Sequence, residues 1–139
     1  MASILKVDEM QGVTNTNEMT IAANNVTITG EGTATMRLQQ GVAKSWAHVS
    51  QSSTQTLDDS LNVASITDEG TGDASYTLTN AMSDSNFSVT ALTGYKANSS
   101  VEIAHLRELT ASKVRIRNTN SSSYRDPETY CSTVQGDLA

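Results

Sequence analysis

The sequence predicts an all-β fold, in which an extended N-terminal β-arm precedes an antiparallel β-sandwich of the jelly-roll or Ig-like kind. Short segments alternate apolar and polar side chains with the period of two that is typical of strands. Turn-forming Gly, Asn, Ser and Asp residues separate these segments, and no long stretch has the spacing of an amphipathic helix. Because only 37% of the residues are hydrophobic and 4% are aromatic, we expect a thin core on one side of each sheet.

The chain divides into an arm, residues 1–41, and a knob, residues 42–139. All the aromatic residues lie at or beyond Trp46, so the arm contains only short aliphatic alternations. Isolated strands of this kind are not stable alone in water. We therefore expect the arm to dock on a partner surface, through apolar side chains near its start: Ile4, Leu5, Val7, Met10 and Val13.

The knob contains a regular succession of predicted strands, at residues 43–50, 61–67, 74–80, 86–92, 101–109, 112–118 and 129–135. The Gly- and Asp-rich segment 68–73 predicts a hairpin turn, followed by Tyr76 and Leu78 on one face of the next strand. The first of these strands opens the sandwich. The last closes it, after a loop that contains the only proline, Pro127. Residues 34–44 are also compatible with a short helix.

Composition argues against several classes of function. The formal net charge of −6 does not suit a nucleic-acid-binding surface, which needs clustered Lys and Arg. Cys131 is the only cysteine, so the chain has no intrachain disulfide and no cysteine-based zinc site, and we expect this residue to be buried as a small hydrophobe. The chain has neither a secretory signal nor an apolar run that spans a bilayer, which predicts cytoplasmic synthesis and folding.

The motifs predict neither an enzyme nor a cofactor-binding protein. The segment "GEGTAT", residues 30–35, lacks the third glycine of a dinucleotide fingerprint and is interpreted as a turn. There is no G-x-S-x-G nucleophile motif, and the two histidines are His48 and His105, of which His105 is expected to be hydrogen-bonded or at an interface.

Two clusters of carboxylates leave a choice between calcium binding and ordinary turn chemistry. Asp68, Glu69 and Asp73 lie in the predicted hairpin turn, and Asp58 and Asp59 form a second acidic group. Neither has the twelve-residue spacing of a calcium loop that a Glu closes. Hairpin chemistry is the favoured interpretation, without a metal.

Two further groups of residues are candidates for surface recognition. Lys113, Arg115 and Arg117 share one face of a predicted strand, and form either an anion-binding patch or, as we favour, a solvated face balanced by Glu102 or Glu108. Two tyrosines lie beside cations in polar, turn-rich loops, a combination that suits sugar stacking or an interface anchor. These pairs are Tyr95 with Lys96 and Tyr124 with Arg125.

The amino-acid sequences of two segments resemble those of a known protein family. "SILKVDEMQG" resembles the N-terminal segment of tail fibres and other appendage proteins of marine and cyanobacterial bacteriophages. The stretch "LQQGVAKSWAHV…LDDSLNVASITDEGTGDASYTLTNAMSDSNFSV" is similar to a β-sandwich module of the same proteins. The resemblance covers roughly residues 3–12 and 38–90 and includes no catalytic motif. The chain has no room for the long shaft that such fibres carry.

The resemblance implies a virion structural protein, assembled in the bacterial host cytoplasm and displayed on the virion surface as a homotrimer. Its arm would dock on another virion protein, of the tail or the capsid, and its knob would face outward toward a host-surface glycan. Two alternatives stay open at this point. One is a capsid decoration protein that stabilises the phage head, and the other is a free carbohydrate-binding module.

Overall fold

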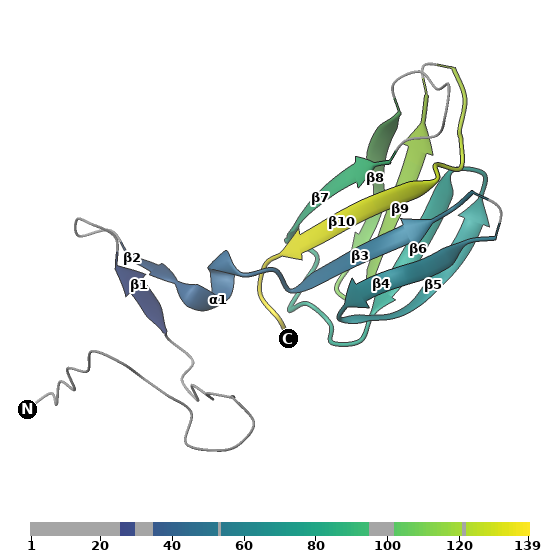
Figure 1. Cartoon of the computed structure of the whole chain (residues 1–139). Coiled ribbons are helices and arrows are strands. Elements are labelled where there is room, and N and C mark those ends of the chain that lie inside the picture. Colours follow the sequence, from purple (N-terminus) through teal and green to yellow (C-terminus); the bar gives the residue numbers. More distant parts are fainter. Residues whose placement is uncertain (1–25, 30–34, 53, 95–101, 121) are drawn as a thin grey trace, which may run out of the picture.

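The computed structural model describes residues 26–29, 35–52, 54–94, 102–120 and 122–139. Within these residues, two antiparallel four-stranded sheets pack together, which confirms the predicted β-sandwich (Figure 1). The elements are β1 Thr27–Thr29, β2 Thr35–Arg37, α1 Leu38–Gly41, β3 Ser45–Ser50, β4 Thr56–Leu61, β5 Val63–Gly70, β6 Asp73–Leu78, β7 Ser88–Thr93, β8 Ile103–Thr110, β9 Lys113–Thr119 and β10 Thr129–Gln135.

The strand order is β4-β3-β10-β7 in one sheet, here called the first sheet, and β5-β6-β9-β8 in the other, the second sheet. In the first sheet, β3 and β10 pair along their length, from Ser50 opposite Thr129 to Ser45 opposite Val134. The strand that opens the sandwich is therefore hydrogen-bonded to the strand that closes it, a pairing that the sequence did not predict. Each of the two is a central strand of its sheet.

The hairpin predicted around residues 68–73 has a shorter turn than expected. β5 continues to Gly70 and β6 begins at Asp73, so Thr71 and Gly72 alone form the turn. Gly70, which ends β5, and Gly72, within the turn, both have positive φ, 120° and 68°. This backbone region is accessible to glycine at little cost and explains why the chain can reverse so tightly here.

The sequence analysis missed β4, which lies between the predicted strands 43–50 and 61–67. β4 and β5 belong to different sheets and are separated only by Asn62, which has a φ of 58°. Its side chain accepts a hydrogen bond from the backbone N–H of Asn80 (2.7 Å) and donates to the carbonyls of Lys44 and Asn80 (3.0 Å each). Asn62 is thus the corner at which the chain crosses from one sheet to the other.

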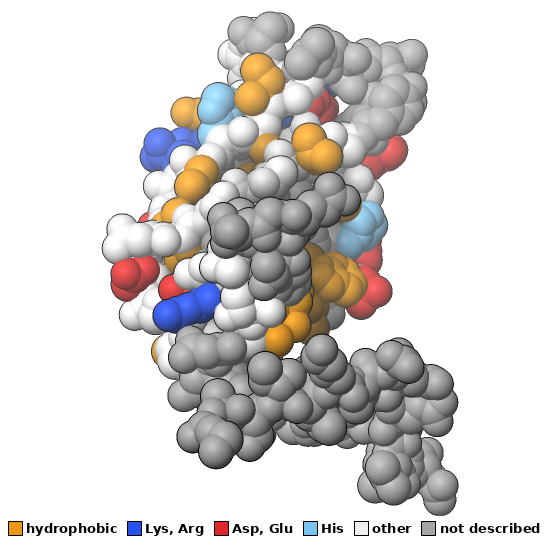
Figure 2. Space-filling model, turned by 90° about the vertical axis from the view of Figure 1, so that its left-hand side faces the viewer, with side chains coloured by type: hydrophobic (Ala, Val, Ile, Leu, Met, Phe, Trp, Pro, Cys, Tyr) orange, Lys and Arg blue, Asp and Glu red, His pale blue; other side chains and the backbone are white. Residues whose placement is uncertain are grey.

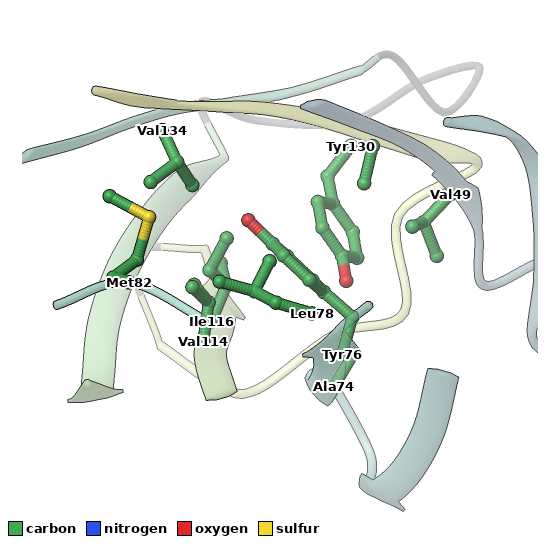
Figure 3. Close-up of a cluster of buried hydrophobic side chains, with 10 residues drawn as sticks. Val49, Ala74, Tyr76, Leu78, Met82, Val114, Ile116, Tyr130 and Val134 are labelled. Carbon is green, nitrogen blue, oxygen red and sulfur yellow. The ribbon is translucent and has the colours of Figure 1, made fainter. Parts of the chain in front are cut away.

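The core lies between the two sheets and is built by alternating side chains of the central strands (Figure 3). The Tyr76 and Tyr130 rings project toward each other from opposite sheets, and the Tyr76 hydroxyl is 3.0 Å from that of Ser132. The buried hydrophobic residues are Ala47, Val49, Ala74, Tyr76, Leu78, Met82, Val114, Ile116, Tyr130 and Val134. The predicted inward residues Val89 and Ala91 of β7, and Phe87 just before it, pack against this core.

Cys131 is not buried, which corrects the sequence-based expectation. On β10 the inward positions are Tyr130, Ser132 and Val134, and the residues between them are exposed. Cys131 therefore lies on the outer face of the first sheet, opposite His48 and Leu92 in register. The expectation used only the hydrophobic character of the thiol. The alternation of β10, in which both neighbours of Cys131 are buried, places this residue on the opposite, outer face.

The described part of the arm forms a small hairpin followed by α1. β1 and β2 pair over three residue pairs, and Figure 1 shows α1 between this hairpin and the sandwich. Residues 34–44, which are compatible with a short helix in the sequence, contain the four-residue α1 directly after β2. The buried side chain of Lys44 joins α1 to the knob, because its Nζ donates to the carbonyls of Gln39 and Val42.

Several predictions for the arm lie outside the described residues. They include the docking residues Ile4, Leu5, Val7, Met10 and Val13, and most of the "GEGTAT" segment. The division at residues 41 and 42 also stays a prediction. No helix of the described segments is long and apolar enough to cross a membrane.

Candidate functional site

The outer face of the second sheet carries the basic side chains that the sequence placed together. On β9, Lys113, Arg115 and Arg117 are half-buried on this face, whereas Val114 and Ile116 are buried on the other. β9 lies between β6 and β8, so each basic residue has neighbours on both sides. The charges of those neighbours decide whether this face can attract an anion.

Asp73, the first residue of β6, is the centre of the charge cluster. It lies opposite Arg117 in register and is only 2% exposed. Arg115 donates through Nε and Nη2 to the two carboxylate oxygens (2.8 Å each), and Arg117 donates through Nε to Oδ2 (2.8 Å). Hydrogen bonds from Arg115 lower the pKa of Asp73; burial opposes this shift and Arg117 reinforces it. The hydrogen bonds to Asp73 also raise the pKa values of both guanidiniums.

Lys113 is paired with one carboxylate on each side of β9. Its Nζ lies 3.3 Å from Oε1 of Glu69 on β5 and 3.2 Å from Oε2 of Glu108 on β8. The predicted pairing with Glu108 is confirmed, whereas Glu102 makes no ion pair among the described residues. Asp73 pairs with the two arginines, so the positive charges of all three basic side chains of β9 are balanced by carboxylates. Cationic and anionic side chains are also interspersed on the face that Figure 2 shows. This arrangement favours a balanced strand face over an anion-binding patch.

The three carboxylates of the predicted turn all have partners within the protein. Asp68 accepts a hydrogen bond from the backbone of Gly70 (2.9 Å), and Glu69 accepts one from Ser75 (2.8 Å). Asp73 is held by the arginines. No three His, Cys, Asp or Glu residues in the described part of the chain form a group that could hold a metal ion. Hairpin chemistry and ion pairing account for these carboxylates.

The other acidic pair and the histidines also have local partners. Asp58 lies in β4, where its carboxylate is 3.2 Å from Nδ1 of His48, and Asp59 accepts a hydrogen bond from the backbone of Ser60 (2.8 Å). His105 is hydrogen-bonded, as expected, because its Nε2 lies 2.9 Å from the hydroxyl of Thr119.

Tyr124 is the described aromatic residue that combines high exposure with a fixed position. Its side chain is 54% exposed, and the guanidinium carbon of Arg117 lies 4.6 Å from the ring centroid. This separation is typical of a cation–π contact. Because Asp73 fixes Arg117 from the other side, the buried ion pair also positions the tyrosine ring.

The loop that carries Tyr124 is held by local hydrogen bonds. Thr119 and Tyr124 form an isolated β-bridge, and the backbone N–H of Asn120 donates to the carbonyl of Ser123 (3.0 Å). The side-chain oxygen of Asn120 accepts hydrogen bonds from the backbones of Ser122 (2.9 Å) and Ser123 (2.8 Å). This is the turn chemistry that asparagine provides, and it orders the loop without a hydrophobic core.

The base of the same loop packs on the β5–β6 turn. The backbone N–H of Gly72 donates to the carboxylate of Asp126 (2.6 Å), and its carbonyl accepts from the backbone of Asn118 (2.6 Å). A Cβ atom at Gly72 would lie 2.5 Å from the Asn118 carbonyl oxygen and 2.7 Å from that of Arg125. Glycine is therefore required at this position by both its φ and the close approach of the loop.

An open depression of about 490 Å³ lies on this loop. Its lining consists of hydroxyl and amide side chains and one aromatic ring: Thr119, Asn120, Ser122, Ser123 and Tyr124. Such a surface offers hydrogen-bond donors, acceptors and an apolar ring, but no charged group. It suits reversible binding of a polar ligand and contains no nucleophile activated by a neighbouring base.

Only some of the residues predicted to take part in recognition lie within the described structure. Tyr124 is in the depression, and the neighbouring Arg125 is half-buried without being among the lining residues. Tyr95 and Lys96 lie outside the described residues. The sequence analysis missed Asp73 and Arg117 as supports of Tyr124. In the period of two, Asp73 lies on the same face of β6 as Ser75, and this could have been read from the sequence. The pairing of β6 with β9, which brings Asp73 to the arginines, could not.

Comparisons with protein-family models, with curated proteins and with solved structures find no match to this chain. The arguments for its function therefore come from the geometry described above and from the resemblance of two sequence segments.

Proposed function

We propose that the chain is a non-enzymatic bacteriophage virion structural protein, a short tail-fibre-like appendage that its N-terminal arm anchors. In this proposal it is a homotrimer, assembled in the host cytoplasm and displayed on the virion surface. The observation that supports the proposal is the unequal division of structure along the chain. The knob has its own core and closes on itself through β3 and β10, whereas the described part of the arm has no comparable core.

The hairpin of the arm is too small to be stable by itself. β1 and β2 have three residues each, and Met36 remains 49% exposed. Ordering a residue costs about 1–2 kcal/mol of backbone entropy, and a two-stranded hairpin buries too little to offset this cost. A partner that adds strands or covers the apolar side chains would supply the missing stabilisation. A segment that is stable only when it binds a partner is suited to be an attachment arm.

Deletion of residues 1–13 from the protein tests attachment. We expect the truncated protein to fold and remain soluble but to be absent from purified virions, as measured by immunoblotting against the major capsid protein. Tyr124→Ala, on the knob surface, is the matched control and should be incorporated normally. Truncated protein at normal occupancy would contradict the proposal.

The copy number of the full chain tests the location on the virion. An appendage of the tail is expected at a small fraction of the major capsid protein, whereas a capsid decoration would approach its abundance. Light scattering after size-exclusion chromatography tests the oligomeric state, and a monomer at micromolar concentration would remove the proposed trimer.

A further inference from the structure

We propose that the depression beside Tyr124 binds a neutral pyranose unit of a glycan, with the sugar ring stacked on the exposed face of the tyrosine. This inference deepens the proposed function by naming the class of ligand that the displayed knob would recognise. It is argued from the geometry of the loop, and its test is therefore independent of the test for the arm.

The stacking surface is exposed and fixed before any ligand arrives. Arg117 lies over one face of the Tyr124 ring at 4.6 Å, and Tyr124 as a whole is 54% exposed, which leaves the opposite face of the ring as the stacking surface in this proposal. The C–H groups on one side of a pyranose form a flat apolar patch that matches an exposed aromatic face. Because Asp73 holds Arg117, little side-chain freedom remains to be lost on binding.

The polar lining matches the hydroxyl groups of a sugar. Thr119, Ser122 and Ser123 supply hydroxyls: that of Thr119 contacts His105 and those of the serines contact Asn120, and each oxygen keeps a lone pair that can accept a hydrogen bond from a sugar. Asn120 holds the backbone of both serines through its side-chain oxygen. The loop is thus preorganised by bonds within itself, and the depression offers several hydrogen-bonding groups around a single aromatic ring.

A neutral sugar fits this surface better than an acidic one. Among the residues that the structure describes, those that line the depression include no Lys or Arg. Arg117 lies directly behind the ring, but its guanidinium donates to the buried Asp73 carboxylate, as does that of Arg115. A carboxylate or sulfate on the ligand would lose hydration without gaining an unpaired cation among the lining residues.

The test measures binding of defined oligosaccharides to the full-length protein by saturation-transfer NMR and isothermal titration calorimetry. The neutral probes are oligomers of glucose, mannose, galactose and N-acetylglucosamine, and the acidic probes are oligogalacturonate and heparin fragments. We expect at least one neutral probe to bind. Tyr124→Ala should weaken that binding by about tenfold or more, whereas Tyr124→Phe, which keeps the ring, should stay within about threefold of the original affinity.

Leu92→Ala provides the matched control, because Leu92 is 71% exposed on the outer face of the other sheet. The Leu92→Ala variant should bind the neutral probe with unchanged affinity. Failure of every neutral probe to bind, a preference for the acidic probes, or equal binding by Tyr124→Ala would each overturn the inference. Incorporation into virions is scored separately, so loss of sugar binding with normal attachment would reject this site and leave the proposed function intact.

Discussion

Asp73 connects the stability of the second sheet with the geometry of the candidate site. Its buried carboxylate accepts hydrogen bonds from both arginines of β9, one of which supports the Tyr124 ring. A single residue that looks like part of an acidic turn in the sequence therefore anchors three side chains. Its loss should affect both folding stability and the loop.

Replacing Asp73 with Asn is expected to destabilise the protein by about 3 kcal/mol near neutral pH, because two guanidiniums lose their charged partner. The pKa of Asp73 is lowered from 3.8, so its contribution is complete above that pH and is lost as the pH falls through the lower folded-state pKa. The difference in unfolding free energy between the original protein and Asp73→Asn should therefore shrink under acidic conditions. Urea denaturation across the acid range measures it.

Asp59→Asn is the control for this series, since it removes the same charge from an exposed site on the first sheet. It should change stability by less than about 1 kcal/mol. If the difference in unfolding free energy between the original protein and Asp73→Asn does not vary with pH, the ion pair is not the source of the stability.

The two core tyrosines should respond differently to loss of their hydroxyl groups. Tyr76 is hydrogen-bonded to Ser132, whereas the buried Tyr130 hydroxyl has no partner among the described residues. Tyr76→Phe is expected to cost about 1–2 kcal/mol, and Tyr130→Phe should be neutral or stabilising, because it removes an unsatisfied buried polar group. Chemical denaturation of the two variants compares them directly, and a larger loss for Tyr130→Phe would contradict this account of the core.

At the scale of the elements, the period of two in the sequence was enough to find most strands of the knob and their buried faces. It predicted Tyr76 and Leu78 inward on β6, and it separated Val114 and Ile116 from the basic residues of β9. It failed for β4, whose segment contains Asp58 and Asp59, because both carboxylates are exposed on a strand at the edge of its sheet.

Pairing between distant strands could not be predicted in the same way. The neighbours of β9 are set by the packing of the whole sandwich, so the contact of Asp73 with Arg115 and Arg117 was not visible. The expectation of a core on one side of each sheet also failed locally. Asp73 and Ser75 are buried on the outer face of β6, beneath the charged side chains of the neighbouring strands.

The corner between β4 and β5 provides a test at this scale. Asn62 has a left-handed backbone conformation and makes hydrogen bonds to Lys44 and Asn80. Asn62→Gly keeps the backbone conformation but loses these bonds, at a cost of about 1–2 kcal/mol. Asn62→Ala adds the left-handed strain of about 1–2 kcal/mol. Thermal unfolding should rank the original protein above the Gly variant and the Gly variant above the Ala variant, and an Ala variant as stable as the Gly variant would contradict this reading.

At the scale of the whole molecule, the described residues of the knob contain a hydrophobic core, whereas those of the arm form only a short hairpin and α1. A hydrogen bond joins the two in the described residues, from the Lys44 side chain of the knob to the carbonyl of Gln39 in the arm. Removing residues 1–41 takes away this acceptor but no residue of the core cluster. The stability of the knob should therefore depend very little on the arm.

Equilibrium unfolding of residues 42–139, compared with that of the full chain, tests this division most directly. We expect the fragment to unfold cooperatively and to lose no more than about 1 kcal/mol, the contribution of one hydrogen bond. A fragment that fails to fold, or that loses several kcal/mol, would mean that the arm belongs to the core of its own subunit and is not free to attach to another protein.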